Sequence, residues 1–189
     1  MTAKSKLKLI DLLIGNPDKV VNELLGEIFA NKIIKRGNFI IHSSIGGYHR
    51  TDGPAVEGPN GYKEWWLYGR RHREDGPAIE YSNGVEFWYL NDKLHRTDGP
   101  AVTRYNIKEW RIDGVLHRED GPAVEYKDGS LMWYSKGKLH RTHGPAREWI
   151  SGRKEWFIRG QRHRTNGPAI EDSGGLKEWF LRGKRVDPL

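Results

Sequence analysis

The stretch HREDGPA, residues 72–78, is one of six copies of the pattern HRxxGPA in this chain of 189 residues. The copies are 23, 23, 22, 23 and 23 residues apart and start at His49, His72, His95, His117, His140 and His163. A fixed period of this length is the signature of a repeat array, in which each unit stacks on its neighbours. Each repeating residue therefore serves either the stacking or a partner.

A tight hairpin is predicted between a repeating Trp and the motif His seven residues later. The Trp positions are Trp65, Trp88, Trp110, Trp133, Trp156 and, before an incomplete last unit, Trp179. Five units have Gly three residues before the motif His, or before the equivalent position of the last unit: Gly69, Gly114, Gly137, Gly160 and Gly183. The remaining unit has Asn91-Asp92 in this turn. Gly, Asn and Asp tolerate positive φ, which two-residue turns of types I′ and II′ require.

The turn also sets the residues that face each other across the hairpin. Trp is expected opposite His, so both residue types are predicted to have structural roles. For His these are His72, His95, His117, His140 and His163. The residue before Trp is then expected opposite the Arg after His. The predicted cross-strand charge pairs are Glu64 with Arg73, Glu109 with Arg118, and Glu155 with Arg164.

A second, shorter strand follows each motif. Gly-Pro marks a turn or bulge, because Pro has no amide hydrogen to donate. Residues 78–81 and 123–126 alternate small or charged with apolar side chains, and Gly84 and Gly129 then lie in turns. The sequence therefore predicts a β-meander.

These units resemble the membrane occupation and recognition nexus (MORN) repeat. The likeness rests on the 23-residue period, the aromatic strand, the Gly before His and the later Gly-containing turn, over about residues 38–186. Arg follows His where that family usually has Gly, and Gly-Pro-Ala replaces a simple Gly, so the units are a diverged MORN-like subtype. The resemblance implies a mainly β, elongated, single-layer antiparallel meander that acts as a protein-interaction scaffold; it does not imply membrane binding.

The first 37 residues have a different character and are expected to form a helical cap, with the array over residues 38–189. Asn16, Pro17 and Asp18 are typical of a helix start. Apolar residues then recur at helical spacing up to Gly37, at Val20, Val21, Leu24, Leu25, Ile28, Phe29, Ile33 and Ile34. We expect this segment to cover the open edge of the first repeat. Alternatively it is a dimerisation or partner-docking helix.

Composition narrows the cell location and the chemistry. The chain has no Cys, which excludes disulfides and thiolate metal sites. No segment has the ~18 apolar residues that span a bilayer. Asp11 interrupts the apolar stretch at the start of the chain, and no small-residue cleavage site follows. We therefore expect no secretory signal and a cytoplasmic location.

The net charge of +7 suggests an acidic partner. Residues 1–37 contain seven basic and four acidic side chains, which leaves +4 for the array. Toward the end, basic residues alternate with aromatic ones: Arg147, Arg153, Lys154, Arg159, Arg162, Arg164, Lys177, Arg182, Lys184 and Arg185 with Trp149, Trp156, Phe157, Trp179 and Phe180. Such a pattern can stack bases and hold phosphates, so single-stranded nucleic acid is an alternative partner.

The repeating His residues are poorly spaced for a metal site. Equivalent side chains in adjacent units should lie ~9.5 Å apart, whereas ligands of one ion all lie ~2 Å from it. We therefore expect no metal and no cofactor. Asp follows the His by three residues at Asp52, Asp75, Asp98 and Asp120, but other units have His143 and Asn166 there. A role in the turn is favoured over a His–carboxylate acid–base pair.

Departures from the internal consensus are either drift or directed at a partner. Arg and Trp are the residue types found most often at binding hot spots. The predicted partner-binding set is Arg104, Arg111, His143, Arg147, Trp149, Phe157 and Arg159.

The sequence thus predicts a non-enzymatic scaffold that binds a macromolecule, most simply a protein, through its elongated sheet. Similar arrays occur in bacterial, phage and large-virus proteins, so a role as an inhibitor or antitoxin-like protein follows by analogy. Alternatives are a single-stranded nucleic-acid binder and, less favoured, a hydrolase. Homo-oligomers could form through the N-terminal helices.

Overall fold

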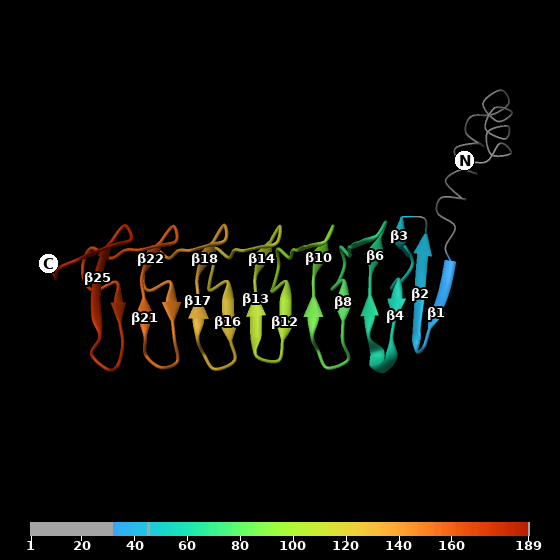
Figure 1. Cartoon of the computed structure of the whole chain (residues 1–189), viewed down its shortest axis with the longest axis horizontal. Coiled ribbons are helices and arrows are strands. Elements are labelled where there is room, and N and C mark those ends of the chain that lie inside the picture. The colour runs from blue at the N-terminus through green and yellow to red at the C-terminus, as the bar shows by residue number, and fades with distance from the viewer. Residues whose placement is uncertain (1–31, 45, 189) are drawn as a thin grey trace, which may run out of the picture.

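A computed structural model describes residues 32–44 and 46–188 of the chain. They form an elongated, mainly β ribbon, in which short strands run across the long axis from one end to the other (Figure 1). One antiparallel sheet of 16 strands runs along the whole ribbon, and five two-stranded hairpins lie along one of its sides.

The strands of the long sheet are β1 (Lys32–Arg36), β2 (Phe39–Ser44), β3 (Gly47–Tyr48), β4 (Val56–Glu57), β5 (Lys63–Glu64), β8 (Ile79–Glu80), β9 (Glu86–Phe87), β12 (Val102–Arg104), β13 (Ile107–Glu109), β16 (Val124–Tyr126), β17 (Leu131–Met132), β20 (Arg147–Glu148), β21 (Lys154–Glu155), β24 (Ile170–Glu171), β25 (Lys177–Leu181) and β26 (Lys184–Val186). A 3-10 turn, η1 (Pro59–Gly61), joins β4 to β5.

The five two-stranded hairpins pair β6 (Trp66–Leu67) with β7 (Arg70–Arg71), β10 (Tyr89–Leu90) with β11 (Lys93–Leu94), β14 (Arg111–Ile112) with β15 (Val115–Leu116), β18 (Tyr134–Ser135) with β19 (Lys138–Leu139), and β22 (Phe157–Ile158) with β23 (Gln161–Arg162). In the last unit β25 extends from the long sheet into the hairpin position and pairs with β26.

The hairpin turns have the backbone geometry that the sequence predicts. In the unit of Trp110, Asp113 has a φ of 49° and Gly114 a φ of 84°, and Asn91 and Asp92 are also both positive. Two consecutive positive φ values define type I′. The expected register holds as well, because the His72 amide donates to the carbonyl of Trp65 at 3.2 Å.

Backbone hydrogen bonds join each unit to the next. The amide of Arg73 donates to the carbonyl of Tyr89 one unit further on, at 3.1 Å. In the reverse direction, the turn amide of Gly114 donates to Leu94 of the preceding unit at 2.8 Å. The hairpins are therefore held in a row although each pair forms a separate small sheet.

The core is a narrow strip where the hairpins meet the long sheet. The motif Ala residues are completely buried there: Ala55, Ala78, Ala101, Ala123, Ala146 and Ala169. In the middle of the ribbon, Leu139 and Phe157 of the hairpins pack with Val124 and Met132 of the long sheet. Main chain is bonded on both sides of these residues, as at Ala78, whose carbonyl accepts from the Trp65 amide and whose amide donates to the Phe87 carbonyl, so only a small side chain fits there.

Two sequence-based predictions are wrong. Residues 32–36, including Ile33 and Ile34, form strand β1 paired with β2, not the end of a helix. Strand pairing satisfies the backbone groups of both strands along five residue pairs. The rest of the predicted helical cap, residues 1–31, lies outside the described residues.

The predicted cross-strand charge pairs are the second error. Glu64 lies opposite Val56 and Ile79 in the long sheet and not opposite Arg73. Glu109 pairs with Arg111 and Glu155 with Arg153, while Arg118 and Arg164 pair with Glu125 and Glu171. The reason is that in each unit the main chain leaves the hairpin after His. The Arg that follows therefore does not lie beside the residue before Trp.

Candidate aromatic and arginine-rich interface

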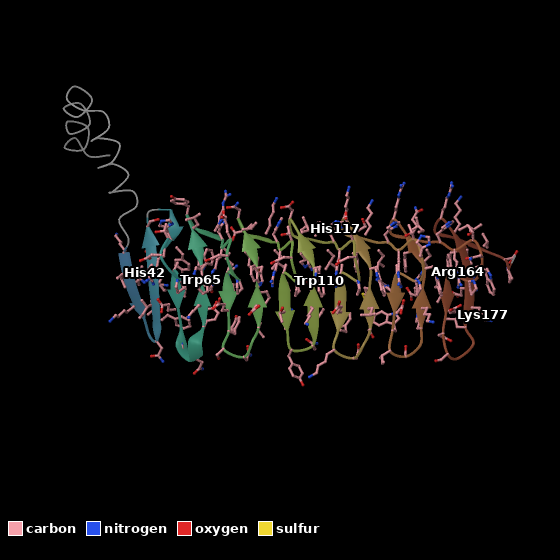
Figure 2. The ribbon with its side chains drawn as sticks, turned by 180° about the vertical axis from the view of Figure 1, so that it is seen from behind. His42, Trp65, Trp110, His117, Arg164 and Lys177 are labelled. Atoms are coloured by element: carbon pink, nitrogen blue, oxygen red, sulfur yellow. The ribbon has the colours of Figure 1, made fainter. Side chains whose placement is uncertain are left out.

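The ribbon has two faces of different chemistry, because successive residues of a strand point to opposite sides. We call one the motif face; it carries the repeating Trp side chains and the motif Arg side chains. Trp65, Trp110 and Arg164 lie in one row along the ribbon (Figure 2). We call the other the variable face; after each Trp it carries Trp66, Tyr89, Arg111, Tyr134, Phe157 and Phe180. It also carries a row of residues that lie opposite one another on neighbouring strands of the long sheet, such as Glu64, Ile79 and Phe87.

On the motif face, each Arg guanidinium lies over the Trp ring of its own unit. The distances from Cζ to the ring centroid are 3.9, 3.8, 4.1, 3.7 and 3.8 Å for Arg73, Arg96, Arg118, Arg141 and Arg164. Such cation–π contacts stabilise most when they are shielded from water. They explain why the pattern repeats Trp and Arg together.

The same guanidinium is fixed by hydrogen bonds. Arg118 donates from Nη1 to the Pro122 carbonyl at 3.2 Å and to Glu125 at 2.9 Å, and from Nε to Asp120 at 2.9 Å. The motif Asp therefore binds Arg and not His. These hydrogen bonds and the Arg charge lower the pKa of the carboxyls of Asp52, Asp75, Asp98 and Asp120.

The motif Gly leaves room for this guanidinium. A Cβ at Gly76 would lie 2.5 Å from Cζ of Arg73, and the equivalent Gly residues are also close to their Arg groups. Real Cβ contacts are not this short, so Arg and Gly form one packing unit.

The repeating His residues link neighbouring units. Nδ1 of His140 accepts a hydrogen bond from the Arg159 amide at 3.2 Å, and Nδ1 of His163 accepts one from Arg182 at 3.1 Å. His49, His72, His95 and His117 accept the same bond from the next turn. In His117, His140 and His163 this bond assigns the proton of the neutral imidazole to Nε2.

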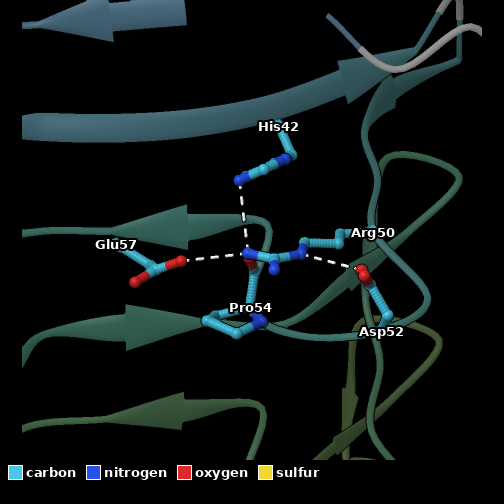
Figure 3. Close-up of polar contacts among 5 residues, drawn as sticks. All are labelled: His42, Arg50, Asp52, Pro54 and Glu57. Carbon is cyan, nitrogen blue, oxygen red and sulfur yellow. Dashed lines mark hydrogen bonds and ion pairs between the residues drawn. The ribbon is translucent and has the colours of Figure 1, made fainter. Parts of the chain in front are cut away.

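The first unit has His42 in the register of Trp, which a search for the motif alone does not find. The His42 amide donates to Ala55, as the Trp65 amide does to Ala78. Figure 3 shows Arg50 surrounded by four partners. Its Nη1 is 3.2 Å from His42 Nε2 and donates to the Pro54 carbonyl and to Glu57, while Nε donates to Asp52. This cluster closes the N-terminal end of the Trp–Arg row.

On the variable face, the unit of Trp65 also balances its charges. The buried Glu64 carboxylate accepts hydrogen bonds from the Tyr62 hydroxyl, from Trp66 Nε1 at 2.7 Å and from Arg71 Nε at 3.3 Å. Burial, followed by the bond to Glu64, raises the pKa of Tyr62. Arg71 also lies over the Trp66 ring, at 4.6 Å.

A hollow of about 690 Å³ lies beside this cluster. Phe39, Tyr48, Tyr62 and Tyr81 contribute aromatic side chains to its lining. Gly58 has no side chain there, and a Cβ would lie 2.6 Å from Phe39. The hollow holds no His side chain in its lining.

The predicted partner-binding residues fall into two groups. Arg104, Arg111, Arg147 and Phe157 are on the variable face, and Trp149 packs against the same core cluster as Phe157. Phe157 itself is only 7% exposed, so it supports the surface and offers little contact area. His143 lies exposed in a motif turn and Arg159 in a hairpin turn, away from this group.

The predicted partner-binding set leaves out Arg153 and Arg162, which the sequence analysis named only in the alternation of basic and aromatic residues. Arg147 and Arg162 both lie over the Phe157 ring, at 5.5 and 5.7 Å. The sequence contains a pattern that could have indicated Arg162: Glu is followed by Arg seven residues later in Glu64 and Arg71, Glu155 and Arg162, and Glu178 and Arg185.

Within residues 32–44 and 46–188, no group of three or more His, Asp or Glu side chains is placed to hold a metal ion. In the same part of the chain, no helix has the length and apolar character needed to cross a bilayer. Comparisons with protein families, with curated proteins and with solved structures found no match.

Proposed function

We propose that this protein is a non-enzymatic scaffold that binds a protein partner through the variable face. One observation carries the proposal: the side chains of the motif face repeat from unit to unit, whereas those of the variable face differ between units. On the motif face the guanidinium groups of Arg50, Arg73 and Arg118 are each paired with both Asp and Glu. On the variable face, half-exposed aromatic side chains and Arg groups change from unit to unit.

Protein interfaces are enriched in aromatic residues and Arg, and a few such side chains dominate the binding energy. The differences between units would give each sector of the ribbon its own contacts. The proposal includes the MORN-like assignment of the units and a cytoplasmic location. By analogy with other arrays, it extends to an inhibitor or antitoxin-like role.

The test is affinity capture from the native host with the full chain as bait, compared with two variants of the variable face. Arg104 is exposed at the end of β12, and Trp149 is half-buried further along the ribbon. We expect Arg104→Ala or Trp149→Ala to lose the captured protein while the thermal unfolding transition is retained.

Arg70→Ala is the matched control, because Arg70 is exposed on the motif face. Capture that is equal for the wild type and both variable-face variants would reject this face as the binding surface. Since Trp149 contacts the core cluster, Arg104→Ala gives the cleaner result if Trp149→Ala unfolds.

Single-stranded nucleic acid is the second candidate, favoured by the alternation of Arg groups and rings. Arg162 lies over both Phe157 and Phe180, at 5.7 and 5.5 Å. Cations interleaved with rings can hold phosphates and stack bases. This function predicts binding of random oligonucleotides that weakens steeply with salt, and no shift at low salt would remove it.

A further inference from the structure

Around Phe157 the guanidinium groups of the variable face outnumber the carboxylates. Arg147 and Arg153 both contact the buried carboxylate of Glu155, and a third guanidinium group, that of Arg162, lies over the same Phe157 ring as Arg147. Arg153 takes the short contact at 2.8 Å, and Arg147 reaches the other oxygen only at 3.5 Å. Two positive charges are therefore in excess at this site.

Comparison with the other units shows which group is missing. Arg71 and Arg185 occupy the register of Arg162, and each pairs with the Glu seven residues earlier, at 3.3 and 3.5 Å. In the unit of Arg162 this residue is Glu155, and its carboxylate is used by Arg153 and Arg147. Arg162 thus has the position of an ion-paired Arg without its carboxylate.

Burial makes the absence of a carboxylate partner costly in free energy. Nε of Arg147 and Nε of Arg162 are both shielded from solvent, and neither has a hydrogen-bond partner among the described residues. Buried polar groups of folded proteins nearly always have one, so two such groups at one site call for an explanation. Each group loses solvation without gaining a bond.

We propose that Arg147 and Arg162 bind a carboxylate side chain of an acidic peptide segment in the partner. The inference rests on the proposed function and names the chemistry of its partner. Both Arg side chains are only half-buried, so their Nη atoms can donate paired hydrogen bonds to a carboxylate although Nε is shielded from solvent. Trp149, which packs on the same cluster as Phe157, lies in the same sector to contact apolar parts of the peptide.

A carboxylate is favoured over a phosphate because the equivalent Arg side chains of this face bind carboxylates. Glu64 serves Arg71, and Glu178 serves Arg185. The peptide would supply the same group from outside. Nucleic acid is the competing outcome of the test.

The experiment measures fluorescence anisotropy of a fluorescein-labelled decaglutamate peptide with the full chain at low salt. The comparison probes are a decaglutamine peptide and an oligothymidylate of similar length. We expect decaglutamate to bind and decaglutamine not to bind. Arg162→Gln should weaken decaglutamate binding about tenfold, the loss expected for one charge-assisted hydrogen bond. Arg147→Gln provides the same test if Arg162→Gln does not fold.

Arg70→Gln removes an equal charge from the motif face and should change decaglutamate binding by less than about twofold, as expected for a screened surface charge. Absence of decaglutamate binding, or an equal loss in Arg70→Gln, would overturn the acidic-peptide site. Tighter binding of oligothymidylate that depends on Arg162 would overturn it in favour of nucleic acid. If decaglutamate fails while capture still depends on Arg104 or Trp149, the scaffold function stands without this site.

Discussion

At the scale of single residues, HRxxGPA describes one packing arrangement. Arg lies over Trp, its nitrogen atoms bind the Pro carbonyl and a later Glu, and Gly leaves the space that the guanidinium fills. His reaches the next unit through Nδ1, and Ala is completely buried. His, Arg, Gly and Ala of the pattern thus each have a contact or a space that a different side chain would disturb, whereas Pro contributes its main-chain carbonyl.

The pairing of Gly and Arg predicts non-additive mutations. In Gly76→Ala the new Cβ displaces the Arg73 guanidinium from Trp65, so we expect a loss of about 1 to 3 kcal/mol in the free energy of unfolding. In an Arg73→Ala background the same change should cost much less. Urea unfolding of the four proteins of this double-mutant cycle measures the coupling. Equal costs in both backgrounds would contradict the packing argument.

The motif Asp residues predict an acid-sensitive stability. Arg73 lowers the pKa of Asp75 in the folded chain, and three other motif carboxyls behave alike. A lowered folded pKa means that the contribution is complete above the unfolded pKa, about 3.9, and is lost as the pH falls through the folded pKa.

We therefore expect the unfolding temperature to fall below about pH 4. A variant with Asp52→Asn, Asp75→Asn, Asp98→Asn and Asp120→Asn should show a flatter decline there. Thermal unfolding from pH 7 to pH 2 measures both. Because these carboxylates are exposed, roughly 0.5 M NaCl should reduce the difference between the two proteins. Parallel curves would show that the Asp–Arg pairs add no stability.

Sequence reasoning placed the repeating residues better than it placed their partners. The Trp–His register followed from the turn, since a two-residue hairpin allows one alignment. The partners of Arg73 and Glu64 did not follow, because they depend on how the chain leaves the hairpin after His72. Arg147 was selected as a departure from the repeat, but its excess charge is visible only when Arg153 and Arg162 are placed beside Glu155.

At the scale of elements, the hairpin turns are the most regular parts of the ribbon. Gly114 has a φ of 84° and nothing near its missing Cβ, whereas a Cβ at Gly69 would lie 2.4 Å from the Gly46 carbonyl oxygen. These two turns separate the conformational cost of a side chain from its steric cost.

We expect Gly114→Ala to lower the free energy of unfolding by about 1 to 2 kcal/mol, the cost of left-handed backbone for an L-residue. Gly69→Ala should cost more, because it adds a backbone clash between the first two units. Chemical denaturation of both variants compares them directly. A smaller loss for Gly69→Ala would mean that the first unit moves aside without cost.

The strand at residues 32–36 shows why element type was harder to predict at the start of the array. Ile33 and Ile34 continue an apolar pattern of helical spacing, but they also fit a strand, and five apolar or basic residues cannot distinguish the two. Pairing with Phe39–Ser44 decides the outcome, and it is a contact between segments joined by the turn at Gly37.

At the scale of the whole molecule, each unit bonds to its immediate neighbours along the ribbon. Stability should then be close to a sum of unit terms and neighbour terms. Deleting residues 118–140, which joins His117 to Arg141, removes one period and restores the same register. We expect a folded protein of unchanged β signal in circular dichroism and a lower urea midpoint.

Deleting 11 residues from the same place, 118–128, is the control. It joins His117 to Gly129 and removes part of one unit, including strand β16, so the remaining strands lose their partners. This variant should lose its cooperative unfolding transition. Similar behaviour of the two deletions would contradict the unit-by-unit description of the fold.

The strands of the ribbon lie across the line between its two ends (Figure 1). A force applied at the two ends of the ribbon formed by the described residues therefore loads the outermost unit first, because the next unit is reached only after the first has peeled away. Each rupture would release roughly 75 Å of slack, the extended length of one period. Under tension this molecule would lengthen as a staircase of small, equal steps and not break in a single event.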